Sequence, residues 1–298
     1  MTKDYSYSDY VGDPFRATHA LGDLLGRGAL RLFLGAGASC GFGLPDWKTL
    51  IARVTKRDTD SAFVAGLKDK DTMELGRLVN KVDDGSESYI DLVRASLYRD
   101  ASPDLLVQLQ QSRLLLAIGA LMTGSCRGRI ESVVTYNYDD LLEQYLWMLG
   151  YSACRRVRPS DLSTRSDVVV DYVHGCVPQQ KKTGDGAPQI VLSAQSFIER
   201  RADIDEGWPA SVIAGLMSKI GLFVGLSGND TTMIEQITRA KNKGFTTRLD
   251  DYNAYWLLTP DAFDRNGEMI LKAGSCPIRL DKDVIPDLLL AVCRHAAA

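Results

Sequence analysis

The stretch LFLGAGASCGFGLPDW, residues 32–47, joins a short apolar run to four glycines and ends on an acid and a tryptophan. Glycines that follow a β-rich run let the backbone turn tightly and approach a ligand closely. A strand, a glycine turn and a helix in this order can place a phosphate at a helix N-terminus. The stretch therefore predicts a strand followed by a nucleotide-binding turn that contains Gly35 and Gly37.

The glycine spacing does not match a standard nucleotide motif. Gly41 comes one position too late for the dehydrogenase fingerprint, and no Gly-Lys-Ser/Thr follows to make a P-loop. On this stretch alone, a dinucleotide site and a merely structural turn both remain open.

Several other apolar, β-rich runs alternate with helix-like stretches along the chain. The strong strand candidates are residues 29–35, 130–137, 168–175, 219–227, 253–259 and 275–280, with a weaker one at 189–193. Many lack period-2 alternation, as expected for strands that are covered on both faces. The pattern predicts an α/β fold, a Rossmann-like parallel sheet with helices on both faces.

The first two strong strand candidates are separated by a long region without a good strand. Residues 88–98 and 112–124 within it show helical spacing of apolar positions. This is far longer than a single crossover needs. We therefore expect one domain, residues 1–298, with a helical insertion at about residues 60–125.

Composition and net charge argue against several classes of function. The net charge of −3 argues against direct nucleic-acid binding, and we interpret the basic cluster Arg155, Arg156 and Arg158 as a solvated loop. No apolar run reaches the ~18 residues that span a bilayer, and the N-terminus lacks a signal peptide's apolar core. The six cysteines include no C-x-x-C pair. We expect a cytoplasmic protein that binds neither membrane nor metal.

Polar side chains follow three of the predicted strands at their carboxyl ends, where ligands bind in open α/β sheets. They are Asn137 and Asp139, then His174, then Ser227 and Asp230. Each also has a structural interpretation. The acids and Asn137 suit helix N-caps, and a lone histidine is often a satisfied core residue.

The motifs GAGAS-x-x-x-GLPDW, TYNYDD, VHG and GLSGND, in this order, resemble those of the sirtuin superfamily. The greatest similarity is to the bacterial sirtuin-like NAD hydrolases of antiphage defence. The resemblance covers about residues 32–47 and 133–230, and the helical insertion is similar only in position.

This resemblance implies a set of NAD-binding residues. They are Gly35, Ala36, Gly37 and Ser39 around the pyrophosphate, Pro45, Asp46 and Trp47 at the nicotinamide end, and Gly225, Ser227 and Asp230 in the segment that touches the adenosine ribose. Among them, Asp46 is similar to the sirtuin acid that contacts the carboxamide.

The resemblance also implies the catalytic residues. Asn137 and Asp139 correspond to the pair that lines the nicotinamide pocket, and His174 corresponds to the general base. An imidazole with its ordinary pKa of ~6.5 would accept a proton from water or a ribose hydroxyl near neutral pH.

Two departures set this chain apart from deacylating sirtuins. It lacks their four zinc cysteines, and Tyr136 and Tyr138 replace the Gln and Ile of their T-Q-N-I-D motif. The expected activity is an NAD+ glycohydrolase (NADase) that forms nicotinamide and ADP-ribose and depletes cellular NAD in abortive infection. A protein deacylase or ADP-ribosyltransferase, and a non-catalytic NAD or ADP-ribose sensor, are the alternatives. Control is expected from a homo-oligomer, a regulatory partner protein encoded nearby, or both.

Overall fold

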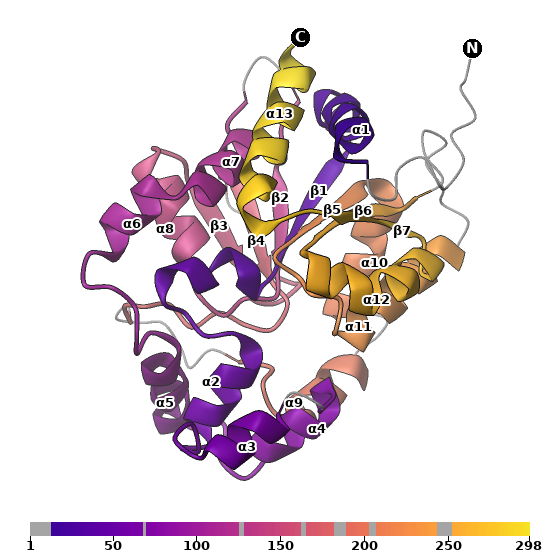
Figure 1. Cartoon of the computed structure of the whole chain (residues 1–298). Coiled ribbons are helices and arrows are strands. Elements are labelled where there is room, and N and C mark those ends of the chain that lie inside the picture. The colour runs from indigo at the N-terminus through magenta and orange to yellow at the C-terminus, as the bar shows by residue number, and fades with distance from the viewer. Residues whose placement is uncertain are drawn as a thin grey trace. The chain divides into compact units, whose positions relative to one another are not determined.

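The structure is a computed structural model that describes residues 13–67, 70–124, 128–161, 165–181, 189–202, 207–242 and 252–298. Its centre is a seven-stranded parallel sheet in the order β3-β4-β2-β1-β5-β6-β7, surrounded by helices (Figure 1). The strands are β1 Leu30–Leu34, β2 Ser132–Thr135, β3 Ala153–Arg156, β4 Val168–Tyr172, β5 Ile220–Val224, β6 Ala254–Leu258 and β7 Ser275–Arg279. The predicted Rossmann-like α/β fold is confirmed.

Burial explains why the strands lack alternation. Every residue of β1, β5 and β6 is buried. The ring of Phe223 in β5 stacks between Phe33 of β1 and Trp256 of β6, at centroid distances of 4.4 and 4.5 Å. Pro277 has no N–H to donate to a neighbouring strand. It lies in β7, an edge strand that has a neighbour on one side only.

Two sequence expectations about strands were wrong. Arg155 and Arg156 lie in the edge strand β3 and not in a solvated loop, because buried or half-buried acids neutralise them. Residues 189–193 form no strand. Their backbone groups bond instead to the segments around Tyr138 and His174.

Many of the described α-helices begin at a local sequence signal. The described α-helices are α1 Pro14–Gly26, α2 Trp47–Val54, α3 Ser61–Gly66, α4 Thr72–Val79, α5 Glu87–Leu97, α6 Leu105–Gln111, α7 Arg113–Met122, α8 Leu141–Met148, α9 Ala194–Ala202, α10 Trp208–Ser218, α11 Thr231–Asn242, α12 Pro260–Lys272 and α13 Ile285–Ala297. An Asp or Ser side chain caps the first turn of α1 to α5 and of α7.

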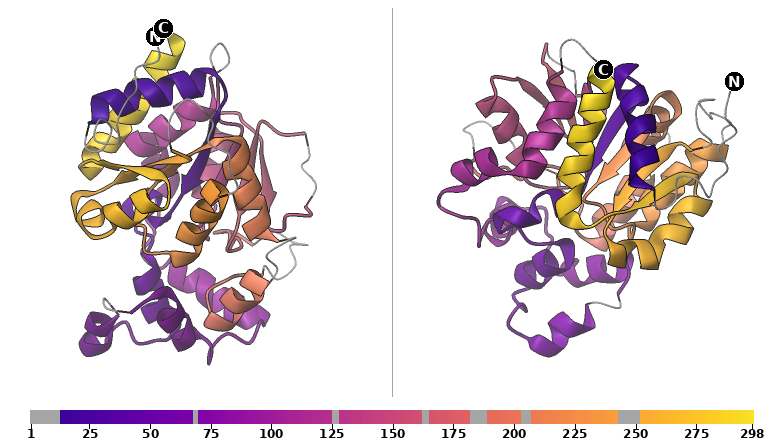
Figure 2. Two further views of the ribbon diagram at one scale, coloured as in Figure 1. Left: turned by 90° about the vertical axis from the view of Figure 1, so that its right-hand side faces the viewer. Right: turned by 45° about the horizontal axis from the view of Figure 1, so that its top comes forward.

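The chain divides into two compact units. Unit 1 comprises residues 1–33, 111–133 and 212–298; within it α13 packs against α1 and α7, and Figure 2 shows α1 and α13 side by side. Unit 2 comprises residues 34–110 and 134–211 and includes α2 to α6, α8 and α9, with α4 against α9. Between β1 and β2 the described residues hold helices only. The boundaries of the helical insertion at 60–125 stay a prediction.

Candidate functional site

The glycine turn leaves β1 as two single 3-10 turns, Ala36–Ala38 and Cys40–Phe42, and α2 begins only at Trp47. Gly35 itself has an extended backbone. Gly43 has a φ of +82°, and an added Cβ would overlap the Asp100 carbonyl oxygen. Close packing against the segment after α5 therefore explains why residue 43 is a glycine. Gly35 and Gly37 lie at the start of the turn.

The turn and the segment after β2 are joined by hydrogen bonds. The Tyr136 N–H donates to the Leu34 carbonyl over 2.9 Å. The Asn137 side-chain amide donates to the Ser39 hydroxyl over 3.0 Å. A further hydrogen bond links Ser39 to the Asp139 carboxylate, which also accepts from the Leu141 N–H. Three predicted site residues thus form one polar chain.

One atom of this chain is unsatisfied. The side-chain carbonyl oxygen Oδ1 of Asn137 is buried and has no hydrogen-bond partner among the residues that the structure describes. Asn137 as a whole is 9% exposed. Leaving such a buried acceptor unpaired costs about 1–3 kcal/mol, which a donor from a water or a bound molecule would recover.

Burial changes the acidity of Asp139. Loss of solvent raises the pKa of this carboxyl from 3.8 to about 6, although the hydrogen bonds from Ser39 and Leu141 oppose the rise. Asp139 is therefore mostly ionised at pH 7 and protonated below about pH 6.

His174 follows β4 and is enclosed by aromatic rings of unit 2. Tyr136, Phe197 and Tyr138 lie 5.2, 5.3 and 6.3 Å from it between ring centroids. Burial, with the positive charge of Arg200, lowers the pKa of His174 to about 3, against a hydrogen bond with the Tyr136 backbone that raises it. The expected pKa of ~6.5 was thus wrong, because the surrounding rings exclude most of the water from the imidazole and Arg200 adds a positive charge. His174 is neutral throughout the physiological range.

The three residues that were expected at a nicotinamide end, Pro45, Asp46 and Trp47, have different surroundings. Asp46 is exposed and caps α2, accepting the Thr49 N–H over 2.8 Å. Pro45 precedes it and is half-buried. Trp47 makes an edge contact with Phe197 at 5.8 Å. Sequence reasoning missed Phe197, because α9 carries no motif and only the fold brings it to His174.

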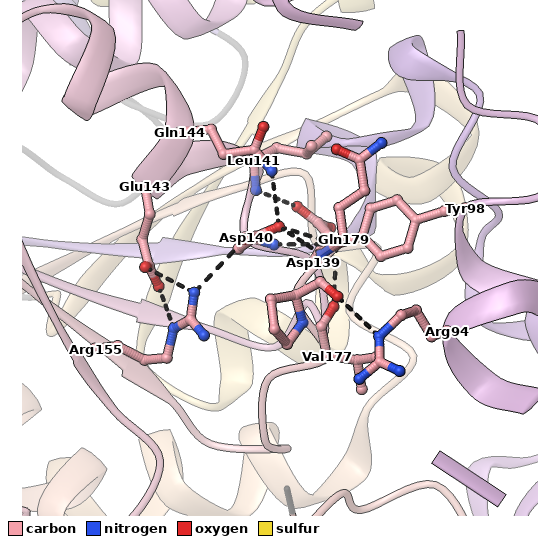
Figure 3. Close-up of polar contacts among 11 residues, drawn as sticks. Arg94, Tyr98, Asp139, Asp140, Leu141, Glu143, Gln144, Arg155, Val177 and Gln179 are labelled. Atoms are coloured by element: carbon pink, nitrogen blue, oxygen red, sulfur yellow. Dashed lines mark hydrogen bonds and ion pairs between the residues drawn. The ribbon is translucent and has the colours of Figure 1, made fainter. Parts of the chain in front are cut away.

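Sequence reasoning also missed a network around Asp140, shown in Figure 3. One carboxylate oxygen of Asp140 accepts from the Tyr98 hydroxyl, the Gln144 side chain and the Gln179 N–H, at 3.0–3.2 Å. The other faces Arg155 at 3.6 Å.

Arg155 in turn pairs bidentately with Glu143, at 2.8 and 2.9 Å. The Tyr98 hydroxyl also donates to the Val177 carbonyl over 3.0 Å. These contacts hold α5, α8 and the chain after VHG together, beside the site. The adjacent acids Asp139 and Asp140 thus have different surroundings, one in the Ser39–Asn137 chain and one in an ion-pair network.

The remaining predicted residues lie in unit 1, beyond the carboxyl end of β5. Gly225 has a φ of +73°, a conformation that favours glycine. The Ser227 carbonyl accepts from the Asn266 side chain over 2.8 Å. Asp230 caps α11 through the Thr232 N–H at 2.9 Å, as its structural interpretation predicted.

Two features of the described residues concern metals and membranes. Within the described ranges, no group of three or more His, Cys, Asp or Glu side chains could hold a metal ion. No single described helix is long and apolar enough to cross a membrane, although α6 and α7 taken together meet the criterion of length and composition.

Residues 131–274, just under half of the chain, match the family described as the SIR2-like domain. The matched range contains Asn137, Asp139 and His174 and the segment from Gly225 to Asp230, but not the glycine turn. This match supports membership of the sirtuin superfamily and fits an NAD-related function. A search of curated proteins found no match.

Proposed function

Starting from the SIR2-like domain match, we propose that this protein is an NAD+ glycohydrolase that splits NAD+ into nicotinamide and ADP-ribose. The bond that breaks joins C1′ of the ribose to the nicotinamide ring nitrogen. Nicotinamide is a cationic leaving group, so its departure needs no strong acid. The requirements are orientation, a placed water and stabilisation of positive charge on the sugar.

The observation that carries the proposal is the buried, unsatisfied Asn137 Oδ1 in a chain of predicted site residues. The hydrogen bond to Ser39 uses the Asn137 amide nitrogen, so the amide orientation is set and Oδ1 is left to accept. A ribose hydroxyl or a water molecule would supply the missing donor. Asn137 would then place the water or the sugar.

Asp139 and His174 suit the other two tasks. Above about pH 6 the Asp139 carboxylate is ionised, and its negative charge opposes the positive charge that develops on the sugar. His174 is neutral, which is the form that accepts a proton from the attacking water. A weak base suffices because the oxocarbenium-like sugar is itself a strong electrophile.

The test is nicotinamide release from NAD by the purified full chain. We expect Asn137→Ala to lower the rate by about 10–100-fold, the effect of losing a buried hydrogen bond. His174→Ala should lower it by about 10²-fold, the low end for a general base, because the His174 pKa lies far below neutral. Asn242→Ala and His19→Ala, at exposed helix positions, serve as matched controls and should retain the wild-type rate.

Other outcomes separate the alternatives. Tight NAD binding without release, alone or with the product of the neighbouring gene, would contradict the hydrolase and favour a sensor. Release that requires an acylated peptide would favour a deacylase.

Regulation belongs to the same proposal. A constantly active NAD hydrolase would exhaust the NAD of its own cell, so the activity requires control. We propose that the protein acts in the cytoplasm in antiphage defence by abortive infection, and that self-association or a partner encoded nearby triggers it. A specific activity that rises with protein concentration, or on addition of the neighbouring gene product, would support this control; a constant specific activity in both titrations would contradict it.

A further inference from the structure

Helix α9 places a phenyl ring directly against the candidate base. Phe197 is 4% exposed, and its ring meets the His174 imidazole edge to face at 5.3 Å and 81°. It also meets Trp47 at 5.8 Å and 87°. Phe197 is thus held between the histidine and the tryptophan that begins α2.

Two more aromatic rings surround the imidazole. Tyr136 meets it edge to face at 5.2 Å and 85°, and the tilted ring of Tyr138 lies at 6.3 Å. His174 nevertheless remains partly exposed. We call Tyr136, Tyr138 and Phe197 the aromatic wall.

Hydrogen bonds tie the segment before α9 to His174 and to one member of the aromatic wall, Tyr138. The Val191 N–H donates to the His174 carbonyl over 2.9 Å, and the Val191 carbonyl accepts from the Tyr138 hydroxyl over 2.6 Å. The first turn of α9 follows at once, and the Phe197 N–H donates to the Ser193 carbonyl. The segment that carries Phe197 is therefore tied to both His174 and Tyr138.

From this arrangement we infer that Phe197 is a specificity-determining residue that favours water over larger acceptors, an inference that rests on the proposed hydrolase function. In that reaction the C1′–nitrogen bond breaks and its electron pair passes to the nicotinamide ring. An acceptor oxygen bonds to C1′ and gives its proton to His174. Since that oxygen must reach both C1′ and the walled imidazole, an acceptor with carbon substituents collides with the phenyl ring.

The test measures how ADP-ribose partitions between water and an alcohol. The full chain is incubated with NAD and increasing methanol, and ADP-ribose and its O-methyl derivative are quantified by mass spectrometry. We expect the wild type to prefer water over methanol by about tenfold per mole, and to exclude ethanol further. Phe197→Leu and Phe197→Ala should raise the methanol share by about tenfold. Ile198→Ala, an exposed neighbour on α9, should leave it unchanged.

The product ratio does not depend on how much of a variant is folded, so it separates specificity from stability. An unchanged ratio in both Phe197 variants would overturn the inference but leave the hydrolase intact. Equal use of methanol and water by the wild type would overturn it even if both variants failed to fold. Absence of nicotinamide release from the wild type would instead overturn the proposed function.

Discussion

The Asn137 side-chain amide donates to the Ser39 hydroxyl over 3.0 Å, and so joins the segment after β2 to the glycine turn after β1. Ser39 also bonds to Asp139 and lowers its pKa. One hydroxyl therefore orients the Asn137 carbonyl oxygen and keeps a buried carboxyl ionisable near neutral pH.

Ser39→Ala should disturb both neighbours. Without its partner the Asn137 amide loses its fixed orientation, and we expect nicotinamide release to fall by about tenfold, the effect of roughly 1.4 kcal/mol. Because the Ser39 hydrogen bond lowers the Asp139 pKa, its removal should move the acid limb of the pH–rate profile above pH 6. A rate profile identical to that of the wild type would show that the hydroxyl has no role.

The adjacent acids Asp139 and Asp140 should respond in opposite ways to amide substitution. Asp139→Asn removes a desolvated charge and should raise the unfolding free energy at pH 8 by about 2–3 kcal/mol while abolishing nicotinamide release. Asp140→Asn withdraws the charge that faces Arg155 within its network and should lower the unfolding free energy by about 2 kcal/mol. Urea unfolding monitored by circular dichroism measures both. Destabilisation by Asp139→Asn at pH 8 would contradict its raised pKa.

His174 and Asp139 should have opposing effects on acid stability. The folded His174 pKa of about 3 lies below its ordinary 6.5, so its contribution is present above pH 6.5 and is lost as pH falls toward 3. The folded Asp139 pKa of about 6 lies above its ordinary 3.8, so its contribution is present at low pH and is lost as pH rises through 6. Between pH 6 and 4 the two contributions to the unfolding free energy change with pH in opposite directions and nearly cancel.

Single variants should reveal separately how each residue makes the unfolding free energy depend on pH. Relative to the wild type, His174→Gln should gain about 1.4 kcal/mol of unfolding free energy for each pH unit from 6 to 4. Asp139→Asn should lose a similar amount over the same interval. Urea titrations at pH 4, 5 and 6 measure the differences, and parallel stability curves for all three proteins would contradict both assignments.

Gly175, the glycine of VHG, should tolerate no side chain. Its φ is +84°, and an added Cβ would overlap the Gln189 carbonyl oxygen. Gly150 has nearly the same φ, +82°, but nothing within 4 Å of its added Cβ. Gly150→Ala should cost about 1 kcal/mol for the left-handed backbone alone. Gly175→Ala should cost several kcal/mol in thermal or urea unfolding; equal losses would mean that the 189–193 segment shifts freely.

Most of the fold was predictable because its cause is local. Strands such as β1 and β5 are covered on both faces and are therefore mostly apolar, with Arg31 as the one charged residue of β1, and such runs are visible in the sequence. The edge strand β3 was not predictable, because Arg155 and Arg156 are accommodated in it only by ion pairs with Glu143 and Asp171. The segment 189–193 looked like a strand, yet its hydrogen bonds go to His174 and Tyr138.

The candidate site also contains residues that motifs predicted and residues that no motif predicted. The motifs named Ser39, Asn137, Asp139 and His174, and the structure places all four in one unit. Phe197 and the Asp140 network carry no such signal, because a contact between distant segments leaves no local pattern.

The parallel α/β architecture and the polar residues after its strands were therefore predictable, since both follow from short-range patterns of burial and turning. The protonation of those residues and the aromatic rings around His174 were not predictable, because they depend on three-dimensional packing. Burial moves the pKa of Asp139 up and that of His174 down, and burial depends on which distant segments, such as α9, come to lie against each group.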